Sequence, residues 1–182
     1  MLILASASPR RHELLLAAGI DHIVRPTFVP ETWNSGELPE DCVRRLALEK
    51  AQACPRSRED TVLAADTVVY VGSEILGKPQ DEIDARRMLR LLSNRSHWVH
   101  TGICLINDRS CIVDLASTEV TVARLGEEEI AEYTQSGESA DKAGAYAIQG
   151  LASKFVVSVH GSYSNVVGLP IALVYSHLKG LS

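Results

Sequence analysis

The first nineteen residues, M-L-I-L-A-S-A-S-P-R-R-H-E-L-L-L-A-A-G (Met1–Gly19), carry the signals of a strand followed directly by a helix. The apolar start is too short for a signal peptide and lacks a basic flank. It is therefore interpreted as a buried strand over residues 2–6. Ser8 favours an N-cap and Pro9 suits the first helical position, and the closing glycine suits a helix end. A helix over residues 9–18 is therefore predicted, as in an α/β protein.

The start of this helix poses an electrostatic problem. Arg10 and Arg11 fall in its first turn, at the positive end of the helix dipole, where each cation is disfavoured by up to about 1 kcal/mol. The chain as a whole carries a formal net charge of −5 at pH 7. A polyanionic ligand would therefore need a local cationic site or a metal ion, and this pair concentrates positive charge at one place.

Beyond this start, helical patterns alternate with strand patterns, which favours an α/β fold in a single domain over residues 1–182. The other predicted elements are helices near 40–53, 81–92, 126–136 and from about 170, strands over 61–71 and near 155–160, and a hairpin of strands 97–106 and 111–124.

Composition narrows the class of protein. Hydrophobic residues make up 46% and charged residues 23%, which is ordinary for a soluble globular protein, and no apolar run approaches the roughly 20 residues of a membrane span. The negative net charge argues against nucleic acid as a partner, and Arg44-Arg45 and Arg86-Arg87 are interpreted as solvated helix faces. Four cysteines without C-x-x-C spacing indicate reduced thiols and a cytoplasmic protein.

Three short stretches carry residues that could do chemistry. In V-L-A-A-D-T-V-V, Asp66 interrupts an apolar strand, and a buried carboxylate costs several kcal/mol unless it is paired, protonated or bound to metal. It is either a strand-end cap or a metal ligand or general base. Lys50 in L-A-L-E-K-A is interpreted as part of an exposed stripe, whereas Lys78 in L-G-K-P is either a solvated surface residue or a phosphate contact.

The segment E-S-A-D-K-A-G-A-Y-A-I-Q-G, residues 138–150, places polar side chains among small residues. Asp141, Lys142 and Gln149 are its candidate functional residues. Glycines at 144 and 150 would let the backbone come close to a ligand, although a purely structural loop remains an alternative.

Seven motifs together resemble, in order and spacing, the Maf family of nucleoside triphosphate pyrophosphatases over essentially the whole chain. The motifs are S-A-S-P-R-R, L-A-L-E-K-A, A-A-D-T-V-V, L-G-K-P, H-W-V-H-T-G, D-K-A-G-A-Y-A-I-Q-G and G-S-Y-S-N-V-V-G-L-P. The resemblance implies a mixed α/β sheet with flanking helices and two lobes around a cleft, similar to inosine triphosphate pyrophosphatases. It also implies hydrolysis between the α and β phosphates, with a divalent metal, to give monophosphate and pyrophosphate.

Within the family, the chain resembles the dTTP/UTP pyrophosphatase branch. This implies that TTP, UTP and 5-modified pyrimidine nucleotides are substrates, in a house-cleaning role for the nucleotide pool. Arg10, Thr67 and Gln149 match the positions that set base preference in that branch. A glutamine amide offers a donor and an acceptor that complement the N3–H and carbonyl of uracil or thymine, whereas cytosine lacks the N3–H.

The resemblance also implies roles for individual residues. Asp66 would be the base or the metal-bound orienter of the attacking water, and Glu31 would help to hold Mg²⁺ or Mn²⁺. Phosphate contacts are assigned to Ser6, Ser8, Arg11, Lys50 and Lys78, with Asp141 and Lys142 as further candidates. A triphosphate at the helix start would explain the two arginines, because their bonds to charged oxygens outweigh the repulsion.

Three positions depart from the family pattern: Pro30-Glu31 stands at a common acidic pair, Asn94 at a common glycine, and Ser139-Ala140 at a proline region. An alternative function is that of a non-catalytic nucleotide-binding regulator of cell division, which would need the cations but not Asp66. A homodimer is left open by the sequence.

Overall fold

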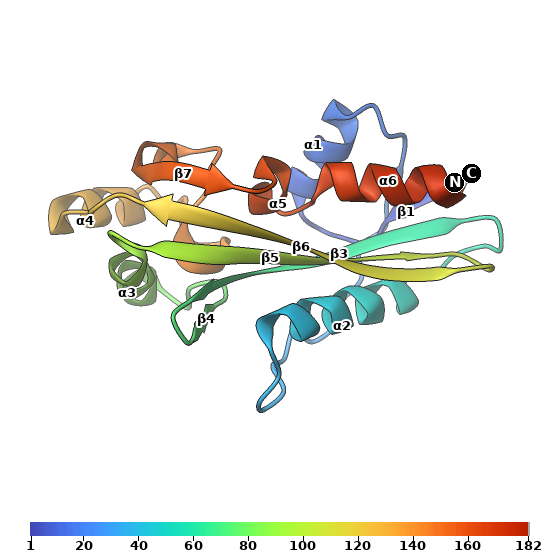
Figure 1. Ribbon diagram of the computed structural model, residues 1–182, viewed down its shortest axis with the longest axis horizontal. Coiled ribbons are helices and arrows are strands. Elements are labelled where there is room, and N and C mark those ends of the chain that lie inside the picture. Colours follow the sequence, from blue (N-terminus) through green and yellow to red (C-terminus); the bar gives the residue numbers. More distant parts are fainter. Residues whose placement is uncertain (182) are drawn as a thin grey trace. The chain divides into compact units, whose positions relative to one another are not determined.

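The computed structural model describes residues 1–181, which divide into two compact units (Figure 1). Unit 1 comprises Met1–Thr67, Thr101–Ala116 and the residues from Gly168 onward, and unit 2 comprises Val68–His100 and Ser117–Val167. Three strands run from one unit into the other: β3 (Thr61–Val71), β5 (Ser96–Ile106) and β6 (Cys111–Val122).

The strand order is β2-β1-β3-β5-β6-β7, with β4 paired to β3. β1 (Leu2–Leu4) runs parallel to both β2 (Ile23–Val24) and β3, whereas β4 (Glu74–Leu76) is antiparallel to β3 and β7 (Val156–His160) is antiparallel to β6. The predicted mixed sheet with flanking helices is confirmed.

In unit 1, helices cover both faces of the strands. α2 (Pro39–Gln52) lies on one face, and α1 (Pro9–Ala17) and α6 (Ile171–Leu181) lie on the other (Figure 1). Successive residues of a strand point to opposite faces. The core against α2 therefore contains Ile3, Val62 and Ala64, and the core on the α1 and α6 side contains Leu4, Leu63 and Ala65.

This alternation decides which helix can reach each polar residue that follows along β3. Asp66 comes two residues after Ala64 and so shares the face covered by α2. Thr67 comes two residues after Ala65 and shares the face covered by α1. Adjacent residues of one strand are thus presented to different helices.

Unit 2 contains the remaining elements. They are α3 (Glu82–Leu92), α4 (Glu127–Gln135), α5 (Tyr163–Val167) and two short 3₁₀ helices, Ala143–Ala145 and Leu151–Phe155, with β4 and β7. α3 begins at Asp81, whose carboxylate accepts a hydrogen bond from Asp84 N at 2.8 Å. Its buried side is formed by Ala85, Met88, Leu89 and Leu92.

The predicted elements are present with ends within one or two residues of those expected, but β2, β4 and α5 were not predicted. β2 has only two residues, both exposed, so it leaves no hydrophobic pattern. Asn94 has φ 57°, a left-handed conformation in which asparagine is tolerated and glycine is favoured, which explains that departure from the family pattern. Within residues 1–181, no helix is both long and apolar enough to cross a membrane.

Candidate active site

A lysine held between two carboxylates forms the centre of the candidate site in unit 1. Lys50 Nζ donates to Asp66 Oδ1 at 2.6 Å and to Glu31 Oε1 at 2.6 Å. The side chains of Lys50 and Asp66 are 9% and 8% exposed, whereas that of Glu31 is 52% exposed. The burial of Asp66 is therefore balanced by an ion pair, and the alternative interpretation of Lys50 as a solvated surface residue is wrong.

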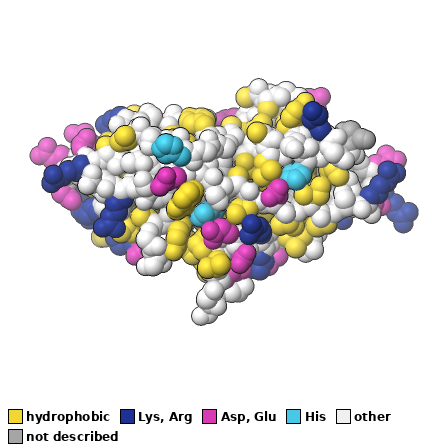
Figure 2. Space-filling view, viewed as in Figure 1, with side chains coloured by type: hydrophobic (Ala, Val, Ile, Leu, Met, Phe, Trp, Pro, Cys, Tyr) yellow, Lys and Arg dark blue, Asp and Glu magenta, His cyan; other side chains and the backbone are white. Residues whose placement is uncertain are grey.

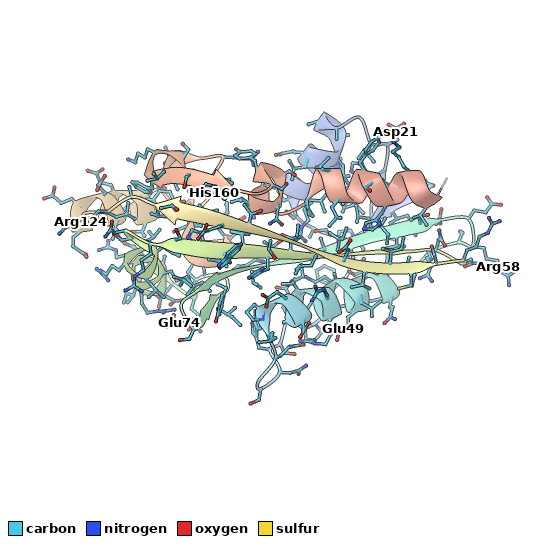
Figure 3. All side chains as sticks on the ribbon, viewed as in Figure 1. Asp21, Glu49, Arg58, Glu74, Arg124 and His160 are labelled. Carbon is cyan, nitrogen blue, oxygen red and sulfur yellow. The ribbon has the colours of Figure 1, made fainter. Side chains whose placement is uncertain are left out.

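Helical periodicity explains how Lys50 reaches Asp66. Lys50 follows Leu46 and Ala47 by four and three residues, so it lies on the same buried face of α2. That face packs against the strand face to which Asp66 belongs. Glu49, the preceding residue (labelled in Figure 3), instead accepts a hydrogen bond from Arg45 Nη1 at 3.1 Å.

Arg45 ties down the loop that carries Glu31. It makes a two-pronged ion pair with Glu37, with Nε and Nη2 each 2.7 Å from a carboxylate oxygen, and Nη2 also donates to Thr32 O at 2.9 Å. The hydrogen bonds from Arg45 lower the pKa of Glu37 to about 2. The side chain of Arg45 is 26% exposed, so it is partly solvated as predicted, but no local sequence signal showed that it also holds this loop.

The other arginines of these pairs do form surface ion pairs. Arg44 bonds to Asp41, Arg86 to Glu82, and Arg87 to both Glu74 and Asp84. Figure 2 accordingly shows acidic and basic side chains interspersed over the face in view. Such pairs contribute little to stability, typically less than about 1 kcal/mol each.

Arg11 occupies the edge of β3 beyond the point where β1 ends. Ala5 N still bonds to Leu63 O at 2.8 Å, but the next carbonyl on that edge, Ala65 O, accepts from Arg11 Nη1 at 2.8 Å instead. Arg11 Nε donates to Gly168 O, also at 2.8 Å. The guanidinium thus substitutes for a continued strand, which explains why β1 is shorter than predicted.

Two hydroxyl groups complete the surroundings of Arg11. Nη1 donates to Ser6 Oγ and Nη2 to Thr67 Oγ1, both at 3.1 Å, and Thr67 Oγ1 lies 2.9 Å from Thr101 Oγ1. Four of the five guanidinium N–H groups therefore donate to protein atoms, and a two-pronged phosphate contact would require one of these bonds to be released.

The charges around Arg11 connect it to the lysine cluster. Burial lowers the pKa of Arg11 below its ordinary value, while the negative charges of Asp66 and Glu31 act in the opposite direction and that of Arg10 reinforces the lowering. Arg11 stays protonated, because arginine does not lose its charge in proteins. The charges of Arg10, Glu31 and Asp66 therefore all act on Arg11.

The serines near the helix start differ from the prediction in one respect. Ser8 occupies the N-cap position with an extended backbone, but its side chain makes no capping hydrogen bond. Its backbone N instead donates to Ser6 Oγ at 3.2 Å. Ser6 therefore links the backbone before α1 to the guanidinium of Arg11.

In unit 2, the structure brings Lys78 close to the segment that contains Asp141 and Lys142. Gly144 N donates to Gly77 O at 3.0 Å, and Lys142 Nζ bonds to Asp141. Gly144 has φ 69°, and a side chain there would press against Val69, so glycine is required. Lys78 itself is exposed, and Gln149 is exposed on a separate turn of the same unit.

The oxygen ligands present suit a hard divalent cation. Glu31 and Asp66 share one ammonium group, so both carboxylates reach a common position. Within the part of the chain that the structure describes, no group of three or more His, Cys, Asp or Glu side chains is arranged to hold a metal. Mg²⁺ commonly takes only one or two carboxylates and completes its shell with phosphate oxygens and water, so this pair fits it.

Comparison with known proteins places these features in a family. The model of the family described as "Maf-like protein" matches residues 1–181. The chain is 50% identical over 179 residues to a dTTP/UTP pyrophosphatase of Koribacter versatilis, covering 98% of this chain and 93% of that one. It is 54% identical over 175 residues to a dTTP/UTP pyrophosphatase of Anaeromyxobacter dehalogenans strain 2CP-C, covering 94% and 89%.

Among solved structures, the Staphylococcus aureus Ham1 protein has a similar fold, with a TM-score of 0.56 at 16% sequence identity, covering 100% of this chain and 99% of that one. That likeness supports the fold, and the sequence matches span nearly the full chain. The chain belongs to the Maf family.

Proposed function

We propose that this protein hydrolyses UTP and TTP to the nucleoside monophosphate and pyrophosphate. The observation that carries the proposal is the buried Lys50–Asp66 ion pair with Glu31 beside it, in one electrostatic environment with Arg11. Its relatives at about half identity are named dTTP/UTP pyrophosphatases. We assign 5-modified pyrimidine triphosphates to the same site, in a house-cleaning role in the cytoplasm.

In this mechanism, Asp66 orients the attacking water and accepts its proton. Lys50 bonds to Oδ1, and Oδ2 is the atom that we assign to the water. Water attacks the α-phosphorus in line with the departing pyrophosphate, and Lys50 and Lys78 neutralise the charge that develops. Arg11, with Ser6 and Ser8, contacts phosphate oxygens at the start of α1, and Asp141 and Lys142 remain further candidates for contacts in unit 2.

We further propose that Mg²⁺ or Mn²⁺ assists the reaction, held by Glu31 and Asp66 together with substrate phosphates. When bound, the metal would neutralise charge on the phosphates. Arg45 supports this arrangement because its bonds to Thr32 and Glu37 fix the loop that presents Glu31.

Hydrolysis in oxygen-18-labelled water tests the reaction type. We expect UTP to give UMP and pyrophosphate, with the label in the phosphate of UMP, because the α-phosphorus is the atom attacked. Mass spectrometry of the separated products measures this directly. Formation of UDP and orthophosphate would show cleavage at the γ-phosphate and would overturn the proposed mechanism.

Base choice is assigned to Gln149, with Arg10 and Thr67. Thr67 Oγ1 bonds to Arg11, so we assign its influence to the placement of that arginine. Gln149→Ala is expected to lower the ratio of kcat/KM for UTP to that for CTP about tenfold or more, because a site that hydrogen-bonds the correct base rejects a mismatched one strongly. Gln52→Ala, on the exposed end of α2, is the matched control. An unchanged ratio in folded Gln149→Ala would move base reading to other residues.

A further inference from the structure

Gln149 projects from a turn whose backbone is anchored. Gly150 N donates to Ala147 O at 3.1 Å and closes a four-residue turn, with Gln149 at its third position. Gln149 is exposed, whereas Ile148 and Ala152 are 8% and 0% exposed. Leu151, just after the turn, is 55% exposed, so buried residues flank Gln149 directly only on its N-terminal side.

Two side chains hold this turn from opposite ends. On one side, Tyr133 Oη accepts a hydrogen bond from Ala147 N at 3.2 Å. On the other, Glu138 Oε2 accepts one from Leu151 N at 3.0 Å. Tyr133 Oη also donates to Glu138 Oε1 at 3.0 Å, so the two holding groups are themselves connected. We call this connected pair the Tyr133–Glu138 clamp.

The fit of Glu138 against the turn depends on Gly150. A Cβ at position 150 would lie 2.5 Å from Glu138 Oε1 and closer still to Oε2, so only glycine lets the carboxylate reach the backbone. The glycine that follows Gln149 in the I-Q-G motif therefore has a physical reason: it admits the clamp.

The environment of Tyr133 keeps its hydroxyl protonated, which the hydrogen bond to Glu138 requires. Tyr133 is 3% exposed and packs edge-on against Phe155, with ring centroids 5.6 Å apart. Burial, together with the neighbouring Glu138 carboxylate, raises the pKa of Tyr133 well above its ordinary value. The hydroxyl therefore remains a donor to Glu138 over the working pH range.

We infer that Tyr133 and Glu138 are positioning residues for base selectivity, acting through Gln149 without touching the substrate. Hydrogen bonds from an amide are directional, so a turn that is free to shift would present Gln149 in several orientations and would discriminate less between bases. The inference rests on the proposed function, because it assumes that Gln149 reads the base.

Tyr133→Phe removes the hydroxyl that connects the two ends of the clamp and leaves the ring in place. We expect the ratio of kcat/KM for UTP to that for CTP to fall about fivefold, the effect of one hydrogen bond, while kcat for UTP changes less than twofold. Tyr163→Phe is the matched control, because Tyr163 is 50% exposed in the same unit. Thermal unfolding verifies that each variant is folded.

Glu138→Gln provides a second, independent variant. The amide keeps the size of the carboxylate but replaces one accepting oxygen with a donor, so one backbone N–H of the turn loses its partner. We expect the same fall in the UTP to CTP ratio, with Glu128→Gln on the exposed side of α4 as control.

The reference for both variants is Gln149→Ala. If Gln149→Ala lowers the ratio but folded Tyr133→Phe and Glu138→Gln keep it within about twofold of wild type, the clamp has no positioning role and the inference is overturned. If Gln149→Ala itself leaves the ratio unchanged, base reading at Gln149 fails, and the positioning role fails with it. Absence of UMP and pyrophosphate from wild-type reactions would instead contradict the proposed reaction.

Discussion

Asp66→Asn is expected to lower kcat for UTP about 10²-fold or more, while the affinity for the nucleotide changes little. A positioned general base contributes roughly 10²- to 10⁴-fold to a rate, and an amide cannot accept the proton of water. The amide oxygen can still accept a hydrogen bond from Lys50, whose charge remains paired with Glu31. The phosphate-binding groups of unit 1 are therefore left in place.

Steady-state kinetics give the loss in kcat, and calorimetric titration with a non-hydrolysable α,β-imido analogue of UTP gives the affinity. Asp21→Asn is a suitable control, because Asp21 is exposed on the loop between α1 and β2 (Figure 3). Undiminished turnover in folded Asp66→Asn would remove Asp66 from the chemistry. Wild-type protein that binds UTP without any turnover would favour the alternative function, a nucleotide-binding regulator.

The sequence identified Asp66 for a physical reason that required no structure. A carboxylate within an apolar strand must be paired, protonated or metal-bound, and pairing is what the fold supplies. Its partners could not be derived from spacing, because Lys50 and Glu31 belong to a helix and a loop elsewhere along the chain. Alternation along β3 fixed the face of Asp66, but only packing decided that α2 covers that face.

The hydrogen-bond partners of Arg11 could not be predicted from the local sequence. The unfavourable charge at the start of the helix led to the prediction that Arg10 and Arg11 bind an anion, and that stays a prediction. In the structure, Arg11 already has protein partners. The partners in the structure include Ala65 O and Gly168 O, which are carbonyl groups far away in sequence. A pattern in the first turn cannot reveal that β1 ends early and leaves the carbonyl of Ala65 on an open edge. The anion site thus remains a proposal, with Arg11 already held in a fixed orientation.

The packing role of one glycine could also not be predicted from the sequence. H-W-V-H-T-G ends in Gly102, which looks unremarkable within a strand pattern, yet there the backbone of β5 comes very close to that of α2. A Cβ at position 102 would lie 2.7 Å from Arg44 N and closer still to the carbonyl group of Val43. Backbone atoms cannot rotate away as a flexible side chain can, so the contact fixes how near α2 lies to the strands.

Gly102→Ala is therefore expected to lower the free energy of unfolding by about 3 kcal/mol or more, because the added methyl group forces α2 away from β5. For a chain of this length that corresponds to a fall of roughly 6–12 °C in Tm, measured by circular dichroism. Gly180→Ala in α6 is the matched control, because apart from its chain neighbours and its own helix backbone no described residue lies within 4 Å of its Cβ position, and alanine has a higher helix propensity than glycine.

The same substitution should also reduce activity in the fraction that folds. Val43 and Lys50 lie two turns apart on α2, so a shift of the helix at Val43 would also move Lys50 relative to Asp66. The 2.6 Å Lys50–Asp66 contact tolerates little displacement, and misplacing a catalytic group by 1 Å can cost roughly 10²-fold in rate. Kinetics well below the Tm of the variant measure this loss. A Tm within about 2 °C of wild type, with full activity, would show that α2 can move at this contact with no loss of stability or activity.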